Sequence, residues 1–211
     1  MRFVLASASP ARLALLRAAG VEPEVVVSGV DEDSFAGPPA ELALVLAEHK
    51  AQTVADRLAL ASPPHSGSTL VLGCDSVLEL GGQAYGKPSD AAEAVQRWQE
   101  MRGRTGLLHT GHCLVELSPG TDDAAPEHRR VSELATATVH FGRPTDAEID
   151  AYVATGEPLR VAGGFTLDRL GGWFVDSIEG DPGTVLGLSL PLLRTMLDQL
   201  DLDVPRLWAA S

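Results

Sequence analysis

Short apolar runs alternate with amphipathic segments through the first third of the chain. Residues 2–6 and residues 24–28 are apolar runs of the length and composition typical of buried strands. Between them, a Ser-Pro pair suited to a helix cap and first position opens a predicted helix over residues 10–19, which ends before a glycine. Residues 40–60 are rich in Ala and Leu, with polar residues at helical spacing, and predict a long amphipathic helix.

The rest of the chain adds a central strand and a hairpin. A strongly apolar run interrupted by polar residues predicts a central strand over 69–80, and residues 107–117 and 133–141 predict paired strands. Loops are expected over the Pro/Gly/Ser-rich residues 61–68 and the polar residues 118–130. The remaining helices are expected from residue 89 or 90 to 101, from 145 to about 156 after a capping box, and over 188–200.

Strands that alternate with helices and are followed by a hairpin predict an α/β fold with a mixed sheet. We expect one continuous domain over residues 1–211, with a division into two lobes around a cleft left open. Hydrophobic residues make up 45% and charged residues 21% of the chain, which is ordinary for a globular domain and excludes disordered or collagen-like classes. Cys74 and Cys113 lie in apolar runs without a CxxC motif, so buried free thiols are expected rather than a zinc or redox site.

The formal net charge of −13 argues against a groove for a nucleic-acid polymer, which needs a basic stripe. It is compatible with a phosphate ligand if a metal ion offsets the carboxylates. The first apolar run breaks at Ser7 without the features of a secretory signal, and no stretch approaches the ~18 uninterrupted apolar residues of a membrane span. A cytoplasmic protein without membrane association is therefore expected.

Polar residues at the end of the first strand form the first candidate site. Ser7 and Ser9 stand beside the start of the predicted helix, where free backbone N–H groups and the helix dipole favour an anion. Arg12, in the first turn, could reach back to a phosphate with its bidentate guanidinium. The alternative is a simple strand–cap–helix joint with a surface arginine.

Acidic residues mark a second candidate site. Asp75 interrupts a strongly apolar strand, and a buried charge needs a partner, a metal or a chemical role. A hydrogen-bonded structural aspartate is an equal alternative on this feature alone. The acidic turn 31–33, which contains Glu32, could hold Mg²⁺ or Mn²⁺ beside a polyphosphate, although such a cluster is usually a solvated turn. Lys50, on the long helix, would by itself be assigned to a solvated helix face.

Residues 81–88 superficially match a phosphate-binding P-loop. Pro88 stands where that loop needs a metal-binding Ser or Thr, and proline lacks the backbone N–H of a phosphate cradle. The P-loop is therefore rejected. What remains is Lys87 held between a glycine and a proline, either as a placed cation or as part of a surface turn.

The glycine-rich segment 162–172 could allow a ligand to approach the backbone closely. Within it, Phe165 could stack on a base and Asp168 could accept hydrogen bonds from base N–H groups. A tight turn between strands is the alternative. The sequence shows no nucleophile elbow, zinc-protease motif or dinucleotide-binding fingerprint.

Each of these features is a weak signal alone, but together and in this order they resemble the Maf family over nearly the whole chain. The motifs that carry the resemblance are Leu5-Ala6-Ser7-Ala8-Ser9-Pro10-x-Arg12-x-x-Leu15-Leu16, Asp31-Glu32, Glu48-His49-Lys50-Ala51, Cys74-Asp75-Ser76-Val77, Gly86-Lys87-Pro88, His109-Thr110-Gly111, Glu157-Pro158-Leu159-x-x-Ala162-Gly163 and Gly187-Leu188-Ser189-Leu190-Pro191-Leu192.

The resemblance implies a two-lobed, mixed α/β fold with a central nucleotide cleft, similar to inosine-triphosphate pyrophosphatases. It implies hydrolysis of a nucleoside triphosphate to the monophosphate and pyrophosphate, a requirement for Mg²⁺ or Mn²⁺, a homodimer, and an association with septum formation and cell division. Position by position, Asp75 matches the catalytic carboxylate and a metal ligand, and Glu32 a second acid near the metal. The residues that match the phosphate site are Ser7, Ser9, Arg12, Lys50 and Lys87.

Family groups differ in the glycine-rich segment. Members that prefer dTTP and UTP carry Gln where this chain has Asp168, whereas the group acting on 7-methyl-GTP carries an acid. A carboxylate only accepts hydrogen bonds, so it suits guanine N–H groups or a cationic methylated purine. We therefore expect 7-methyl-GTP or another modified nucleotide as substrate. A dTTP/UTP pyrophosphatase, or a division regulator that binds nucleotides without hydrolysing them, is the alternative. Cys74 and Ser76 replace the family's commoner Ala and Thr, and Ala11 replaces a second basic residue.

Overall fold

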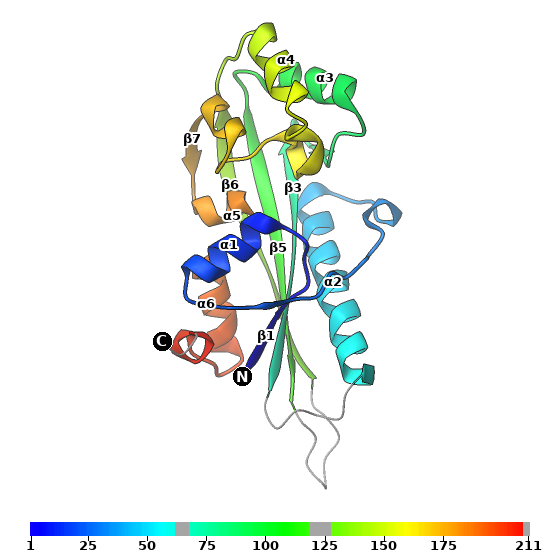
Figure 1. Cartoon of the computed structure of the whole chain (residues 1–211), viewed down its shortest axis with the longest axis vertical. Coiled ribbons are helices and arrows are strands. Elements are labelled where there is room, and N and C mark those ends of the chain that lie inside the picture. The colour runs from blue at the N-terminus through cyan, green and yellow to red at the C-terminus, as the bar shows by residue number, and fades with distance from the viewer. Residues whose placement is uncertain (62–67, 119–127, 209–211) are drawn as a thin grey trace, which may run out of the picture.

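The structure is a computed structural model that describes residues 1–61, 68–118 and 128–208, apart from the side chain of Asp33. The described residues form a curved, mixed sheet covered by helices (Figure 1). The strands are β1 (Arg2–Leu5), β2 (Glu24–Val25), β3 (Thr69–Leu80), β4 (Gln83–Tyr85), β5 (Thr105–Leu117), β6 (His128–Phe141) and β7 (Val175–Glu179).

The sheet has the order β2-β1-β3-β5-β6-β7, and β4 pairs with the far end of β3. β1 runs parallel to both β2 and β3, whereas β3, β5, β6 and β7 are joined by antiparallel pairing. The mixed α/β fold class expected from the sequence is therefore confirmed. The long strands β3 and β5 pair over most of their lengths, from Thr69 opposite Leu117 to Glu79 opposite Leu107, and lie in the middle of the sheet.

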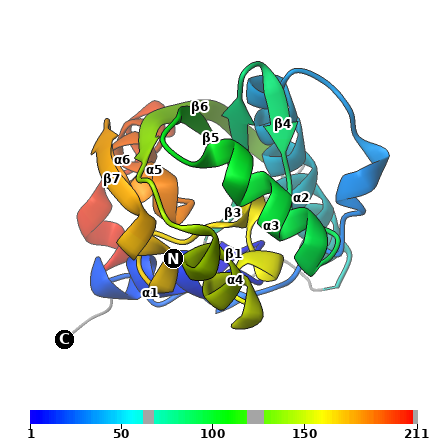
Figure 2. The ribbon, with the colours of Figure 1, turned by 90° about the horizontal axis from the view of Figure 1, so that it is seen from above.

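Helices cover both faces of the sheet, with α2 on one side and α1, α5 and α6 on the other (Figure 1). α3 and α4 lie together at the end of the sheet near β4, as the view from above also shows (Figure 2). The α-helices are α1 (Pro10–Ala18), α2 (Pro39–Ala61), α3 (Ala91–Met101), α4 (Asp146–Ala154), α5 (Pro182–Leu186) and α6 (Leu190–Gln199). Short 3₁₀ helices are η1 (Glu32–Ser34), η2 (Pro158–Arg160), η3 (Ala162–Gly164), η4 (Leu170–Phe174) and η5 (Val204–Leu207).

The core divides along the length of the sheet, which gives the fold two lobes. In one lobe, aliphatic residues of β1, β3, α1 and α6 pack on one face of the sheet, and alanines of α2 pack on the other. In the other lobe, Trp98 of α3 is at the centre of an aromatic cluster and contacts Phe141, Tyr152 and Phe174 edge-on. Because the apolar clusters of the two lobes are separate, the part of β3 between them can carry polar side chains.

The helix and strand predictions agree closely with the structure, with two exceptions. β2 is shorter than predicted because, beyond Val25, the carbonyls of Val27 and Ser28 accept hydrogen bonds from Arg57 rather than from a strand. β6 begins earlier than predicted, at His128, where Arg129 binds the side chain of Glu116 at 2.9 Å. The predicted loops contain residues 62–67 and 119–127, which lie outside the described residues.

Both cysteines are buried free thiols, as predicted. Burial raises the pKa of Cys74 to about 12 and that of Cys113 to about 11, so both thiols stay protonated at neutral pH. No helix in the described parts of the chain is both long and apolar enough to cross a membrane.

Candidate active site

An unpaired stretch on the edge of β3 defines the candidate site. β1 pairs with β3 as far as Leu72, and β4 begins to pair with it at Leu78. Between these points no strand among the described residues hydrogen-bonds to this edge. Asp75 and Ser76 lie in this gap, and because successive strand residues point to opposite faces, they face α2 and α1 respectively.

Two glycines allow α2 to approach the sheet beside Asp75. A Cβ atom on Gly73 would lie 2.3 Å from the carbonyl oxygen of Ala47, and one on Gly111 would lie 2.2 Å from that of Ala43. Gly111 is also the cross-strand partner of Asp75. Any side chain at either glycine would push the helix away, so this pair sets the distance between α2 and Asp75.

Lys50 projects from α2 into the acidic pair that the sequence singled out. Its Nζ lies 2.5 Å from Asp75 Oδ1 and 2.7 Å from Glu32 Oε1, and the lysine is 7% exposed. The second carboxylate oxygen of Glu32 accepts a hydrogen bond of 3.2 Å from the more exposed Lys87. Partial burial acts to raise the pKa of Glu32, but hydrogen bonding and the charges of Lys50 and Lys87 outweigh it and hold that pKa below its ordinary value.

Arg12 occupies the other side of the same gap. Its Nε donates to the carbonyl of Gly187 at 2.8 Å, its Nη1 to Ser7 Oγ at 3.0 Å and its Nη2 to Ser76 Oγ at 3.1 Å. Ser9 acts as the N-cap of α1, accepting a long hydrogen bond of 3.4 Å from the backbone N–H of Arg12. These contacts explain why Arg12 is 8% exposed although it lies in the first turn of a helix.

Two sets of contacts, which meet at adjacent residues of β3, therefore contain all the residues expected to handle phosphate or metal. One runs from Lys87 through Glu32 and Lys50 to Asp75, and the other joins Ser76 to Arg12 and its partners. The predicted members are Ser7, Ser9, Arg12, Glu32, Lys50, Asp75 and Lys87. The sequence did not show which of these residues contact one another, because they are spread along the chain from Ser7 to Lys87.

Phe165 does not lie where the sequence analysis expected. Its ring is 5% exposed and packs edge-on against Phe141 with centroids 5.1 Å apart, inside the aromatic cluster of the second lobe. A ring enclosed in this way presents no face to a nucleotide base, so the expected stacking role is wrong for this structure. Asp168, three residues later, is exposed and remains a candidate for contact with a base.

The glycine-rich segment is packed against the loop that carries Lys87. The backbone N–H of Gly163 donates to the carbonyl of Gly86 at 3.0 Å, and a Cβ on Gly164 would lie 3.4 Å from Pro88. Glu157 organises the segment from the other side, accepting hydrogen bonds from Thr166 and from the backbone of Gly171. The expected base-recognition segment and the expected phosphate lysine are therefore neighbours.

Sequence reasoning assigned no role to several polar residues in or around the site. Ser76, Thr110 and Glu157 lie in motifs that were recognised, and His112 follows one of them, but no chemistry was attached to these residues. Thr110 and His112 are completely buried. The sequence could have singled out Thr110 and His112, because two polar residues on the same face of an apolar strand need buried hydrogen-bond partners.

Glu32 and Asp75 are also the residues expected to hold a divalent metal. They supply carboxylate oxygens, the donor type that Mg²⁺ and Mn²⁺ prefer. Within the described residues, no group of three or more His, Cys, Asp or Glu side chains could hold a metal ion. Two carboxylates still fit the usual Mg²⁺ pattern, in which one or two carboxylates are completed by water and substrate phosphates.

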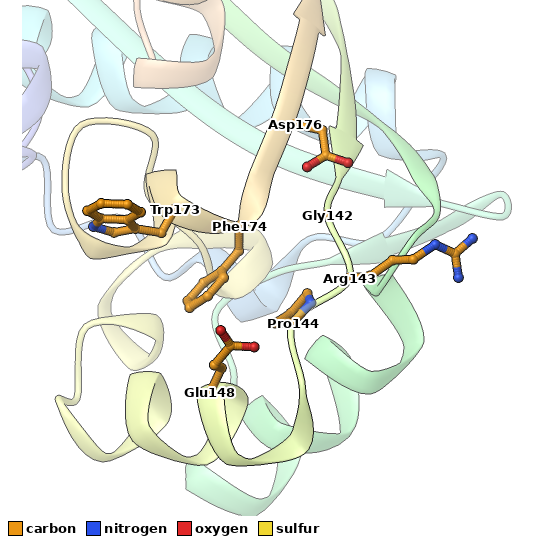
Figure 3. A pocket seen from close by; sticks show the side chains of 7 residues that line it. All are labelled: Gly142, Arg143, Pro144, Glu148, Trp173, Phe174 and Asp176. Atoms are coloured by element: carbon orange, nitrogen blue, oxygen red, sulfur yellow. The ribbon is translucent and has the colours of Figure 1, made fainter.

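A surface pocket of about 380 Å³ lies elsewhere, between the N-terminal end of α4 and the beginning of β7 (Figure 3). Arg143, Glu148, Trp173 and Asp176 are among its lining residues, and none of the candidate-site residues contributes to it. Its lining includes the N-terminal turn of α4 and the end of β6, so we do not assign it to the site around Asp75.

Comparison with known proteins places this geometry in context. A family model described as "Maf-like protein" matches residues 2–200. The chain is 57% identical to the nucleoside triphosphate pyrophosphatase of Salinispora tropica over 210 residues, covering 99% of this chain and 88% of that protein. It is 56% identical to the protein of the same name from Streptomyces coelicolor, covering 100% of this chain and 96% of that protein. The corresponding protein of Mycobacterium ulcerans is 46% identical, with 100% and 98% covered.

Proposed function

Because the chain belongs to the Maf family, we propose that it is a nucleoside triphosphate pyrophosphatase, which hydrolyses a nucleoside triphosphate to the monophosphate and pyrophosphate. The observation that carries the proposal is that Lys50 binds Asp75, Lys87 binds the second acid of that pair, and Arg12 binds the next residue of the strand, Ser76. In a chain with a net charge of −13, three cations at one site point to a polyanionic ligand.

Arg12 and the two lysines would bind the triphosphate in different ways. Arg12 is fixed by three acceptors, which suits bidentate binding of a phosphate, whereas Lys50 and Lys87 act as point charges. Glu32 binds both lysines. A triphosphate would compete with Glu32 for Lys87, which is about half exposed and free to turn toward a ligand.

Asp75 would serve the attack of water on the α-phosphorus. In that step the water oxygen forms a bond to the α-phosphorus, the bond from that phosphorus to the bridging oxygen breaks, and pyrophosphate leaves with the bonding electrons. Asp75 would accept the proton that the water loses. Lys50, 2.5 Å away, would hold the carboxylate in position. Because phosphoryl transfer depends mainly on positioning and on compensation of charge, a site of this composition is suited to it.

Glu32 and Asp75 would hold the divalent cation, Mg²⁺ or Mn²⁺, that the family resemblance implies. When bound, such an ion neutralises phosphate charge and lowers the pKa of a coordinated water. Lys50 contacts both carboxylates, so its ammonium would share them with the ion.

For the base, we propose 7-methyl-GTP or another modified purine nucleotide. The support is Asp168, an exposed carboxylate in the segment that packs against the Lys87 loop. A carboxylate pairs with the N–H groups of guanine and attracts the positive charge of a methylated purine. Uracil and thymine instead present base edges with both hydrogen-bond donors and acceptors. We also propose a cytoplasmic homodimer linked to septum formation, on the family resemblance alone.

Initial rates on 7-methyl-GTP, GTP, dTTP, UTP and CTP, with and without a chelator, test the proposal. Release of monophosphate and pyrophosphate in equal amounts, lost with chelator, is the expected result. Preference for dTTP or UTP would overturn the assignment of the base, and release of orthophosphate would overturn the assignment of the cleaved bond. Nucleotide binding without any turnover would favour a non-hydrolysing regulator. Light scattering on the purified protein tests the dimer.

A further inference from the structure

Two completely buried polar residues of β5, Thr110 and His112, hydrogen-bond to residues around Arg12. Among the described residues, neither hydrogen-bonds to Lys50, Asp75 or Lys87, and neither has a part in the proposed hydrolysis. Burying a hydroxyl and an imidazole in an apolar core is unfavourable unless each is hydrogen-bonded, so their partners indicate what they do.

The hydroxyl of Thr110 fixes the direction of a short hydrogen-bond relay. It donates its single proton to the carbonyl of Thr184 at 2.8 Å, so the contact of 2.9 Å between Ser76 Oγ and Thr110 Oγ1 must use the proton of Ser76. Ser76 then presents only lone pairs to Arg12, whose Nη2 donates to it at 3.1 Å. Thr110 therefore makes Ser76 an obligatory acceptor for the guanidinium.

His112 fixes the other side of Arg12. The backbone N–H of Ser189 donates to Nε2 at 2.9 Å, so Nε2 carries no proton and Nδ1 donates to the carbonyl of Thr110 at 3.0 Å. The contacts from Thr110 to Thr184 and from His112 to Ser189 hold the chain on both sides of Gly187. The carbonyl of Gly187 is the acceptor for Arg12 Nε.

Close packing makes this arrangement sensitive to small changes. Gly187 has a positive φ of 97°, and a Cβ there would lie 2.9 Å from Arg12 Nε, so the guanidinium fits directly against the backbone. Each terminal nitrogen of Arg12 has two N–H groups and gives one to Ser7 or Ser76. In the described part of the chain, this leaves one N–H on each terminal nitrogen for phosphate oxygens.

From these contacts we propose that Thr110 and His112 are positioning residues for Arg12, acting through Ser76 and Gly187 without touching the substrate. The proposal rests on the proposed function only in taking Arg12 to bind phosphate. It extends the site to the buried face of β5. Loss of the Thr110 hydroxyl would free Ser76 to rotate and would leave the guanidinium without one of its three fixed acceptors.

Thr110→Val is the central variant, because it keeps the shape of the side chain and removes the hydroxyl. We expect kcat/KM for the nucleotide to fall about tenfold, close to the value of one buried hydrogen bond, and Thr110→Ser to restore most of it. Thr69→Val, at a buried threonine at the beginning of β3 outside this relay, is the matched control and should change little. If Thr110→Val fails to fold, His112→Leu tests instead the support that His112 gives to the backbone of Gly187 through Ser189.

A double-mutant cycle separates positioning from a general structural effect. In an Arg12→Lys background, Thr110→Val should reduce kcat/KM by less than about twofold, because lysine cannot make the three contacts that Thr110 supports. The same tenfold loss in both backgrounds would overturn the proposal. So would a Thr110→Val protein with unchanged kcat/KM.

A measurement without substrate keeps this proposal distinct from the proposed function. The Nε–H signal of Arg12, followed by nitrogen NMR, should exchange slowly with water in the wild type and about tenfold faster in Thr110→Val, with Thr69→Val unchanged. Absence of turnover in the wild-type protein would overturn the proposed function and leave this test intact. Equal exchange rates in wild type and Thr110→Val would overturn the positioning role.

Discussion

Lys50 and Asp75 form a short ion pair across the interface between a helix and the central strand, with 2.5 Å between Nζ and Oδ1. Both side chains are about nine-tenths buried, and Glu32 is the second carboxylate on the same lysine. A buried lysine between two carboxylates is costly to assemble unless its charge is used.

Replacement of Asp75 by asparagine should abolish most turnover while the fold survives. The amide keeps the size of the side chain but can neither accept the proton from water nor hold a metal as a carboxylate does. A loss of about 10²–10⁴-fold in kcat is expected. Pyrophosphate release measures the rate, and circular dichroism checks the fold. Asp150→Asn, at an exposed position on α4, is the control, and more than a tenth of wild-type activity in Asp75→Asn would contradict the assigned role.

Lys50→Met should destabilise the protein by about 3 kcal/mol, since it leaves Asp75 and Glu32 close together without their shared cation. Urea unfolding measures the change. The exposed Lys87→Met is the matched control, with an expected effect below about 1 kcal/mol. We further expect Mg²⁺ to raise the unfolding free energy of Lys50→Met more than that of wild type, because the ion can replace the missing charge. An equal response to Mg²⁺ would argue against metal binding by these two acids.

Gly73→Ala should disrupt the packing of α2 on the sheet. The added methyl group would lie 2.3 Å from the carbonyl oxygen of Ala47, so the helix must shift and carry Lys50 away from Asp75. A destabilisation of about 2–3 kcal/mol and a fall in activity are expected together. Gly37→Ala is the control, because its Cβ would meet nothing within 4 Å. If thermal unfolding showed the two variants to be equally stable, the tight approach of α2 would be disproved.

Stability should fall in mildly acid solution because of His112. Burial, followed by the positive charge of Arg12, lowers the pKa of His112 from 6.5 to about 4 in the folded protein. Above pH 6.5 the imidazole is neutral in both states, so its contribution is complete. Between pH 6.5 and about 4 the unfolded chain takes up a proton that the folded chain does not, and stability is lost as the pH falls.

The expected loss from this histidine is about 2 kcal/mol between pH 7 and pH 5. Urea unfolding at the two pH values measures it, and His112→Gln provides the reference for all other titrating groups. A wild-type protein whose pH dependence equals that of His112→Gln would show that the imidazole does not titrate differently on folding.

Asp168→Gln should change the choice of base without changing the chemistry. An amide both donates and accepts, so it pairs with uracil or thymine better than a carboxylate does. We expect the ratio of kcat/KM for 7-methyl-GTP to that for UTP to fall about tenfold or more. Asp176→Asn, on β7, serves as a control for loss of an exposed acid. A ratio that stays constant in Asp168→Gln would remove Asp168 from base recognition.

The sequence by itself determined most of the secondary structure. β3 and α2 agree with their predicted bounds to within a residue, because strand and helix periodicities are local properties of the chain. The caps of α1 and α4 were also readable, since a capping side chain bonds to a backbone group only three residues away. Motif order pointed to the family and thereby to the residues of the candidate site.

Tertiary structure alone decided how those residues meet. The contact between Lys50 and Asp75 depends on two glycines that admit the helix, and the orientation of Arg12 depends on a carbonyl 175 residues away. The burial of Phe165 was decided in the same way, by a ring from another strand that packs against it. The physical reason is that side-chain burial and pairing are set by the distance between elements, which no local pattern encodes.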